Sequence, residues 1–230
     1  MNLNAMRQRV WRQLDDDGTY HTPAAVAAVL NEGVRVFCLL TLCQERTETV
    51  AVAARQITPV SALTRYLSVL RIEHDGWKVR PSSIRDWTAR QSDWRVEVLS
   101  EEQPRFLEYA AAGWNQLVFF PAPVVEQSLQ ITWATYPAAM SANEDESGLV
   151  LEDESAILRW ALWRLRLPEG GAELQLAAAD LNLFMALAST RANQVRERSR
   201  SLGYDRLPLE IRIPDLSMKV KREHQQLVAV

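Results

Sequence analysis

The chain carries three histidines, the side chains that most often act as general bases or metal ligands near neutral pH. His21, His74 and His224 lie in three separate segments, so a triad or metal cluster would have to be assembled by the fold alone. No phosphate-binding glycine loop, nucleophile elbow or H-E-x-x-H string occurs in the sequence. We therefore expect no enzyme, no catalytic residues, no cofactor and no metal, and we interpret each histidine as structural or solvent-exposed.

Two acidic stretches are candidates for cation binding, because neighbouring carboxylates attract divalent ions. Asp15-Asp16-Asp17-Gly18 directly follows a helical pattern and lacks the spaced partner ligands of an EF-hand loop. The termination of a helix is the favoured interpretation. Residues 141–154 carry six acids, and we interpret them as an exposed linker in preference to a calcium site.

Eight tryptophans and an arginine-rich stretch could indicate nucleic-acid binding, since aromatic rings stack on bases and arginines pair with phosphates. Trp133, Trp160 and Trp163, however, occupy positions where the pattern requires an apolar side chain, which favours packing in the core. The four arginines of residues 191–200 end a long helical pattern, where positive charge also favours the helix dipole. Ion pairing or dipole stabilisation is the preferred interpretation of these arginines.

The composition argues against several classes of protein. The hydrophobic fraction of 47% and the charged fraction of 24% are those of globular proteins, which argues against disorder and fibrous repeats. The longest apolar run, around residues 34–42, is too short for a transmembrane helix, and the first residues lack the apolar core of a secretory signal. Cys38 and Cys43 are five residues apart in a predicted helix, so no disulfide is expected.

The charge is distributed unevenly along the chain. Residues 191–230 carry nine Lys or Arg against five Asp or Glu, a net charge of +4. Because the whole chain carries −3, the remaining residues carry −7. A basic end on an acidic body suggests an acidic partner surface or a polyanion, although a solvated charged face explains it as well.

The first forty residues predict two helices. Leu3, Met6, Val10 and Leu14 are spaced along one helical face, and the Asp run ends this first helix. Thr22-Pro23 begins the second, since Thr caps free N–H groups and Pro is tolerated at the first helical position. Gly33 lies inside the second helix at a cost of about 1 kcal/mol relative to Ala, so we expect close packing against another backbone at that position.

Residues 47–137 predict a β-rich region, because helical periodicity fades and short runs of Trp, Val, Tyr and Phe accumulate. Leu129, Ile131 and Trp133 alternate with polar residues, as in a half-buried strand. Asp75-Gly76 is a turn signal. A modest β region is also expected around residues 84–93. The candidate strands are residues 49–53, 66–73, 96–99, 105–109, 116–120 and 128–136.

Two further helices follow. Residues 157–165 rebuild a helical face until Pro168-Glu169-Gly170-Gly171 interrupts it. A long helix is predicted over residues 172–202, with Gly203 as its C′ residue. The apolar stripe of this helix is expected to consist of Leu176, Leu183, Phe184 and Leu187.

These elements predict an α+β fold with three parts. Residues 1–46 and 138–203 would form a helical bundle, and residues 47–137 a β-rich insertion, either an antiparallel sheet or a sandwich. Residues 204–230 would form an extended C-terminal arm, because apolar and polar residues alternate there without a hairpin partner. Such a strand returns to its own sheet or adds to that of a partner. The candidate contact residues of the arm are Leu209, Ile211, Ile213, Leu216, Met218, Lys219, Val220, Lys221 and Arg222.

The order of these features resembles the head-to-tail adaptor (connector) proteins of tailed bacteriophages, including the tail accessory and tail tubular A types. The resemblance covers roughly residues 5–200. It depends on a short helix ending in Asp-Asp, a Thr-Pro helix, a tryptophan-rich β insertion and a strand that ends in a Pro-x-Pro turn. These motifs are Asp15-Asp16, Thr22-Pro23 with Leu30-Asn31-Glu32-Gly33, Trp94, and the run from Asn115 to Pro123.

The resemblance implies a structural virion protein of the neck, assembled in the host cytoplasm without a membrane. Identical subunits, commonly twelve, would form a ring beneath the portal protein, and double-stranded DNA would pass through without specific recognition. A tail protein of the nozzle or tail-tube type would bind below. The arm would dock on the portal, with Lys219, Lys221 and Arg222 facing acidic portal residues.

A ring also requires two different lateral faces on each subunit. We expect the helix beginning near Ala172 and the helix that contains Gly33 to provide them. The alternative is a DNA-binding regulatory protein that uses the helix pair around Gly18 as a helix-turn-helix. The acidic turn and the scarcity of Lys and Arg on the second helix count against this alternative.

Overall fold

The computed structural model describes residues 1–52, 58–59, 63–90, 98–99, 105–112 and 116–211. The chain divides into two compact units. The helical unit consists of Met1–Thr41, Pro137–Gln194 and the described residues after Leu207, and the sheet unit consists of Leu42–Tyr136 with Val195–Leu207. The fold is α+β, as the sequence predicts. The division differs from the expected one in placing residues 42–46 and 195–203 in the sheet unit.

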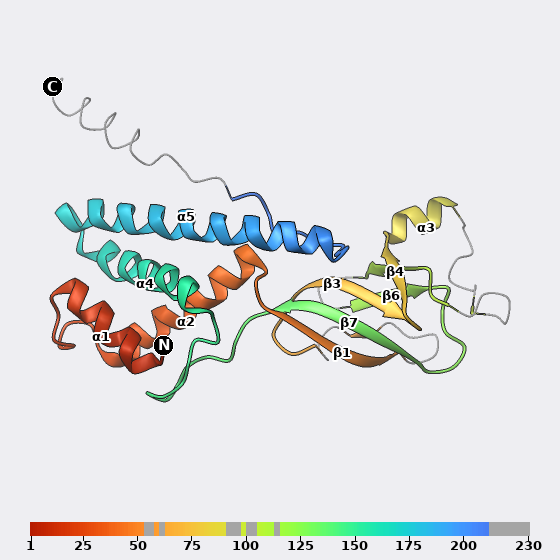
Figure 1. Ribbon diagram of the computed structural model, residues 1–230, viewed down its shortest axis with the longest axis horizontal. Coiled ribbons are helices and arrows are strands. Elements are labelled where there is room, and N and C mark those ends of the chain that lie inside the picture. The colour runs from red at the N-terminus through yellow and green to blue at the C-terminus, as the bar shows by residue number, and fades with distance from the viewer. Residues whose placement is uncertain (53–57, 60–62, 91–97, 100–104, 113–115, 212–230) are drawn as a thin grey trace, which may run out of the picture. The chain divides into compact units, whose positions relative to one another are not determined.

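Helix α1 (Leu3–Leu14) opens the helical unit and buries Leu3, Met6 and Val10 (Figure 1). Its N-terminus is capped by Asn2, whose side chain accepts a hydrogen bond from the Ala5 amide. The helix ends at Asp15, which adopts a left-handed conformation with φ of 54°. The predicted end of this helix is therefore confirmed, and its predicted apolar face is confirmed except at Leu14, which is only half-buried.

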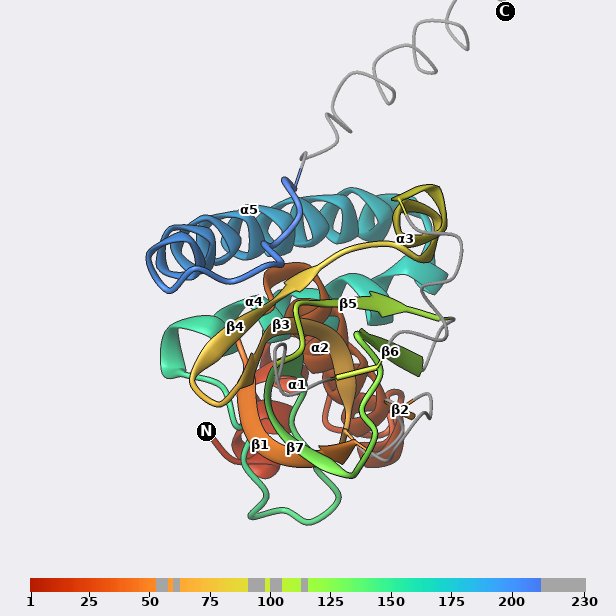
Figure 2. The same ribbon diagram turned by 90° about the vertical axis from the view of Figure 1, so that its right-hand side faces the viewer.

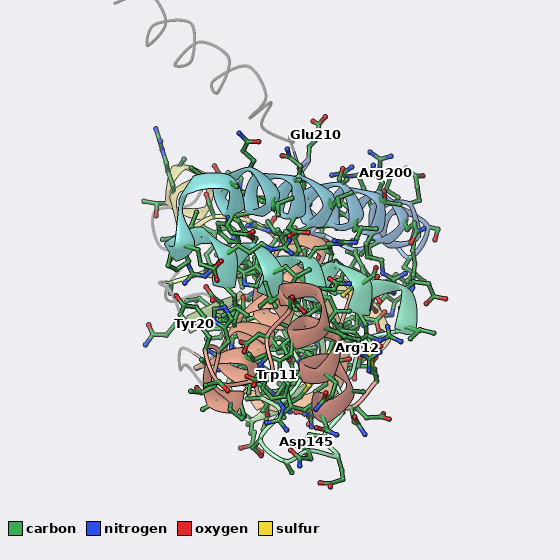
Figure 3. All side chains as sticks on the ribbon, turned by 90° about the vertical axis from the view of Figure 1, so that its left-hand side faces the viewer. Trp11, Arg12, Tyr20, Asp145, Arg200 and Glu210 are labelled. Atoms are coloured by element: carbon green, nitrogen blue, oxygen red, sulfur yellow. The ribbon has the colours of Figure 1, made fainter. Side chains whose placement is uncertain are left out.

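The loop after α1 is organised by the Asp run. Asp16 accepts hydrogen bonds from the backbone amides of Gly18, Tyr20 and His21, at 2.9, 3.3 and 2.8 Å. Burial opposes ionisation of Asp16, but these backbone hydrogen bonds outweigh it and lower its pKa. Asp16 thus shapes a turn, and Figure 3 shows Tyr20 at its edge pointing away from the helices.

Helix α2 (Pro23–Thr41) begins at the predicted Thr-Pro pair, where the Thr22 hydroxyl accepts a hydrogen bond from the Ala25 amide at 3.3 Å. Gly33 faces helix α4 (Leu151–Arg166), and a Cβ added there would lie 2.9 Å from Cδ1 of Trp160. Gly33 packs closely, but against side chains of α4 and not against another backbone as predicted. The nearest neighbour is an indole ring of this same chain, so the Gly33 face of α2 is covered within the helical unit.

By its length and composition, helix α2 could cross a membrane. Of its most apolar stretch, 39% is buried inside the structure. Core helices of water-soluble proteins meet the same criterion. In the helical unit, α2 buries Val26, Leu30, Val34 and Phe37 along one face.

Most of residues 141–154 are exposed or half-buried, as expected, but Ser147, Asp153 and Glu154 are buried. Ser147 is 1% exposed, and its hydroxyl donates to the Glu154 carboxylate at 2.9 Å. Asp153 is 6% exposed and forms an ion pair with Arg191 at 3.2 Å. The prediction failed at these residues because a hydroxyl and an arginine bind acids that appear solvated when the sequence is considered alone.

A short 3-10 turn (Leu167–Glu169) leads to helix α5 (Gly171–Ser201). Its predicted apolar stripe is wrong in three of four positions, since Leu176, Leu183 and Leu187 are exposed and only Phe184 is buried. The inward face consists instead of Ala177, Phe184, Ala188, Ala192 and Val195, at helical spacing. Small alanines allow the neighbouring helices of the unit to approach closely, so the larger leucines lie on the outside.

The sheet unit contains seven strands within the described residues, in the order β1-β7-β3-β4-β5-β6-β2. Every pairing is antiparallel except that of β4 with β5. Figure 2 shows that the sheet is strongly curled. The strands are β1 (Glu45–Val52), β2 (Thr58–Pro59), β3 (Tyr66–His74), β4 (Trp77–Pro81), β5 (Glu108–Ala111), β6 (Gln116–Phe120) and β7 (Gln127–Thr135).

The predicted alternation in β7 is confirmed, since Leu129, Ile131 and Trp133 are buried in the core of the sheet unit. On the opposite face of this strand, the Thr132 hydroxyl lies 2.9 Å from that of Thr47 on β1. Of the weaker strand predictions, residues 105–109 become a strand only from Glu108, and residues 96–97 lie outside the described residues. The side chains of the core are Val52, Leu63, Val69, Ile72, Val79, Phe106, Tyr109, Leu117, Phe119, Leu129, Ile131 and Trp133.

Strand β4 was not predicted, and the β region expected around residues 84–93 is wrong, because helix α3 (Ile84–Arg90) lies there. The Asp75-Gly76 turn that joins β3 to β4 was predicted, and both of its residues have positive φ, as two-residue hairpins require. The sequence also contains the start signal of α3, because Ser83 and Asp86 form a capping pair in which the Asp86 amide donates to the Ser83 hydroxyl at 3.0 Å. The helix is only seven residues long, too short to show periodicity.

Candidate functional site: the root of the C-terminal arm

The residues directly after α5, which include the start of the predicted arm (residues 204–230), are held against the sheet. We call residues 202–207 the arm root, and all of them belong to the sheet unit. Gly203 has a positive φ of 67°, and the Tyr204 amide donates to the Ser199 carbonyl at 2.9 Å. This is the predicted helix C-terminus, and it turns the chain out of α5.

Asp205 is the central anchor of the arm root. Its backbone amide donates to the Leu70 carbonyl of β3 at 2.7 Å. Its carboxylate accepts from the Lys78 ammonium at 2.6 Å and lies 3.5 Å from the Tyr109 hydroxyl. The side chain is only 8% exposed, so this is a partly desolvated ion pair that joins the root to β3, β4 and β5.

Tyr204 provides a second anchor. Its hydroxyl donates to the Glu45 carboxylate of β1 at 2.6 Å, and Arg198 of α5 pairs with the same carboxylate at 3.5 Å. Burial, followed by the hydrogen bond to Glu45, raises the pKa of Tyr204 to about 12. Tyr204 therefore stays protonated and remains a donor at any physiological pH.

Two backbone carbonyls of the root are also used. Arg71 on β3 donates to the Leu202 carbonyl at 3.0 Å, and Lys78 donates to the Gly203 carbonyl at 2.5 Å. These bonds satisfy carbonyls that the end of a helix leaves free. Side chains from the strands therefore hold the root by both its backbone and its side chains.

A depression of about 200 Å³ lies beside the anchor and is lined in part by Tyr66, Tyr109, Asp205 and Arg206. Burial raises the pKa of both tyrosines. Neutral tyrosines beside an ion-paired carboxylate donate hydrogen bonds and do not act as bases at neutral pH. The chemistry of this site is therefore that of anchorage.

The predicted contact residues of the arm follow the root. Leu209 is 75% exposed, Glu210 is exposed and labelled in Figure 3, and Ile211 is half-buried. The described chain ends at Ile211. The other predicted contact residues, which are Ile213, Leu216, Met218, Lys219, Val220, Lys221 and Arg222, lie outside the described residues.

The described histidines have structural partners. His74 is 2% exposed, and its Nδ1 accepts from the Phe106 amide at 3.3 Å, which requires a tautomer without a proton on that nitrogen. His21 lies 3.3 Å from the Glu169 carboxylate. His224 lies outside the described residues. Within the part of the chain that the structure describes, no group of three or more His, Cys, Asp or Glu could hold a metal ion.

The arginines at the end of α5 form ion pairs, as predicted. Arg191 pairs with Asp153, Arg198 with Glu45, and Arg200 with Glu197. Pairs with a buried carboxylate hold the helix in place, whereas the exposed pair of Arg200 and Glu197 contributes little.

Sequence reasoning missed two exposed apolar surfaces. Leu176, Leu183 and Leu187 of α5 are between 37 and 47% exposed, and the heptad separation of the first two was a signal that could have suggested an outer stripe. Trp77 is 60% exposed at the first position of β4. Its position directly after the Asp-Gly turn and before the charged Lys78 was the signal for exposure.

Comparisons with known proteins add no relatives: the chain matches no protein-family model, and it matches no curated protein.

Proposed function

We propose that this chain is a structural subunit, a head-to-tail adaptor of the tailed-bacteriophage type, whose C-terminal arm docks on the portal protein. The anchorage of the arm root is the observation that carries this proposal. Tyr204 and Asp205 bind the root to four strands immediately before exposed Leu209. Asp205 is only 8% exposed, so its ion pair with Lys78 costs desolvation to form and fixes the root in one position on the strands.

The anchorage has a physical advantage for docking. A binding segment whose origin is fixed loses less freedom when it binds, so more of its contact energy appears as affinity. Any pull on the arm is also transferred to β1 and β3 through hydrogen bonds and ion pairs. This is what a neck protein under DNA pressure requires.

The charges of the root support the same proposal. Asp205 is neutralised by Lys78 and Glu45 by Arg198, so the acids that anchor the root are paired. The basic residues Lys219, Lys221 and Arg222 would then be the part of the chain end that binds an acidic portal surface. The acidic remainder of the chain suits a channel through which DNA passes without being gripped.

The outer stripe of α5 supports self-association into a ring. Leu176, Leu183 and Leu187 place three large apolar side chains on one exposed helical face. Clustered exposed leucines are typical of surfaces that a partner covers. We propose that another copy of the chain covers this stripe, and that a tail protein binds below the ring.

No specific observation favours the regulatory alternative. Helix α2, which would be the recognition helix, carries one basic residue, Arg35. The turn before it contains Asp16, whose carboxylate is occupied by backbone amides of that turn. A recognition helix normally presents several basic or amide side chains to DNA.

The proposal is tested with the portal protein of the same genome. Replacing Leu209, Ile211 and Ile213 together by serine should abolish co-sedimentation with the portal, because alternate apolar side chains give strand addition its specificity. The matched control replaces the intervening Glu210 and Arg212 by serine and should retain binding. Both variants should keep the melting temperature of the parent, since the root is unchanged.

Two results would overturn the proposal. One is a triple variant that binds the portal as well as the parent chain does. The other is salt-sensitive retention of DNA in a gel shift without portal binding, which would support the regulator.

A further inference from the structure

The sheet unit carries a basic depression beside β4. It has a volume of about 340 Å³ and is lined by Trp77, Lys78, Arg80, Arg105, Phe106, Leu107 and Glu108, which we call the basic cradle. The Arg80 amide donates to the Leu107 carbonyl at 2.9 Å, so the two walls of the cradle are held together by backbone pairing. The cradle is therefore a built surface on regular structure.

The one acid of the cradle is already occupied. The Glu108 carboxylate receives two hydrogen bonds from Arg90, at 3.0 and 2.5 Å, and one from the Trp87 indole at 2.6 Å. The hydrogen bonds from Arg90 are the main reason that the pKa of Glu108 falls to about 2. Lys78 is likewise engaged with Asp205.

Two guanidinium groups therefore remain for a ligand. Among the described residues, no carboxylate lies within ion-pair distance of Arg80 or Arg105. Arg105 stacks on the indole of Trp77, with its Cζ 4.6 Å from the ring centroid. Trp77 is 60% exposed and Leu107 is 48% exposed, so large apolar walls stand beside the free positive charge. This combination fits an apolar side chain adjacent to a carboxylate.

The helical unit presents such a segment at the start of α4. Val150 is 46% exposed, Leu151 is 69% exposed, and Glu152 follows them with an exposed side chain. The Val150 carbonyl accepts from the amides of Asp153 and Glu154 at 3.0 and 3.3 Å. The turn is therefore rigid, and we call residues 150–152 the acidic turn.

Glu152 differs from its two neighbours in the first turn of α4. Asp153 and Glu154 are buried and bound by Arg191 and Ser147, whereas Glu152 faces solvent. Glu152 also borders a small depression of about 100 Å³ that Leu187 of α5 lines. The acidic turn is therefore continuous with the exposed leucine stripe that we propose as an assembly surface.

We propose that the basic cradle of one copy binds the acidic turn of a second copy. Leu151 would pack against Trp77 and Leu107, and the Glu152 carboxylate would pair with Arg80 and Arg105. Each copy carries both surfaces, so the contact is heterologous and repeats from copy to copy, which is the kind of contact that closes a ring. This inference rests on the proposed self-association and adds the residues that would form the contact.

Charge reversal tests the contact. We expect Arg80→Glu alone and Glu152→Lys alone to weaken self-association at least tenfold in sedimentation velocity over a concentration series. An equal mixture of the two variants should recover self-association, because copies of the two variants can alternate in the assembly. The carboxylate introduced at position 80 then faces the ammonium introduced at position 152, and the unchanged Arg80 faces the unchanged Glu152.

The matched control is Glu126→Lys, since this exposed acid follows exposed Val124 and Val125 in a different loop. It reverses the same charge beside similar apolar side chains without touching the acidic turn. This variant should associate like the parent chain.

Several outcomes would overturn the inference. The first is a parent chain that does not self-associate, and the second is single variants that associate like the parent chain. The third is a mixture of the single variants that fails to recover association while the chain carrying both Arg80→Glu and Glu152→Lys does recover it. The last result would place the contact within one chain. Loss of association with Glu126→Lys would identify a different acidic segment as the occupant. Portal binding through the arm would survive all of these results, so the proposed function can stand when this contact fails.

Discussion

Replacing Gly33 by alanine should lower the stability of the helical unit, although alanine is the better helix former. In an exposed helix the change would gain about 1 kcal/mol. In this structure the new Cβ would lie 2.9 Å from Cδ1 and 3.2 Å from Cγ of Trp160, and 3.3 Å from Cγ2 of Ile157. Carbon atoms do not approach to 2.9 Å without a shift of one of them.

The indole of Trp160 has little room to move. Its ring lies 4.7 Å from that of Trp163 and 4.9 Å from that of Phe184, measured between centroids. Overpacking of this kind costs about 1 to 3 kcal/mol. Subtracting the gain in helix propensity leaves an expected net loss of about 1 kcal/mol.

Urea unfolding followed by circular dichroism at the helical wavelength measures this loss, because helices dominate that signal. Ala28→Gly is the matched control on the exposed side of the same helix and should lose about 1 kcal/mol through propensity alone. Gly33→Ala and Ala28→Gly are opposite substitutions, yet both are expected to destabilise the helical unit. In a Trp160→Leu background, Gly33→Ala should instead stabilise by about 1 kcal/mol, since the clash has been removed. A stabilising Gly33→Ala in the parent chain would refute the packing argument.

Three further predictions concern the anchor, an acid-sensitive pair and the assembly face. Asp205→Asn should cost about 1 kcal/mol in urea unfolding of the sheet unit, because the partner Lys78 is 37% exposed and can be hydrated; no change would show that the anchor is not needed. Glu108 has a pKa lowered to about 2 from 4.5, so its stabilisation is present above pH 4.5 and is lost as the pH falls toward 2. Glu108→Gln should therefore lower the free energy of unfolding by about 1 kcal/mol at pH 7, after allowance for the exposure of Arg90, and should leave it unchanged near pH 2. An equal loss at both pH values would contradict this assignment. Leu183→Glu should change the melting temperature little, since substitutions at exposed sites change stability by no more than about 0.5 kcal/mol. It should weaken self-association in sedimentation velocity. Unchanged association would exclude the α5 stripe as an assembly surface.

Local signals in the sequence predicted much of the fold. The Asp run ends α1, the Thr-Pro pair begins α2, and Gly203 ends α5, because each of these residues acts through its own backbone or its nearest neighbours. The alternation of β7 predicted its buried face for the same reason. Gly33 predicted close packing, although the identity of Trp160 as its neighbour depends on tertiary structure.

The failures depend on partners that are distant in the sequence. Asp153 and Glu154 were expected to be exposed because Arg191 and Ser147, which neutralise them, cannot be assigned from sequence. On α5 the leucines were predicted to be the buried face, because leucine is more hydrophobic than alanine. The sequence does not show which face of α5 the neighbouring helices contact. A helix can bury alanines and expose leucines when close approach of helices is worth more than leucine burial.

The candidate site was predicted in part. The alternation that begins at Leu209 was visible in the sequence, but its anchor was not, because Asp205 pairs with Lys78 across 127 residues of chain. The cradle was also invisible, since Arg80 and Arg105 come together only when β4 pairs with the residues before β5. Non-local strand pairing is the step that sequence patterns specify least.

Electron microscopy of the full chain mixed with the portal ring of the same genome tests the central claim most directly. The proposed adaptor function predicts a second ring stacked coaxially on the portal, with density from each subunit extending along the portal surface from the position of Leu209. A portal ring that remains bare at saturating concentrations of the chain, under conditions where both proteins are folded, would contradict it.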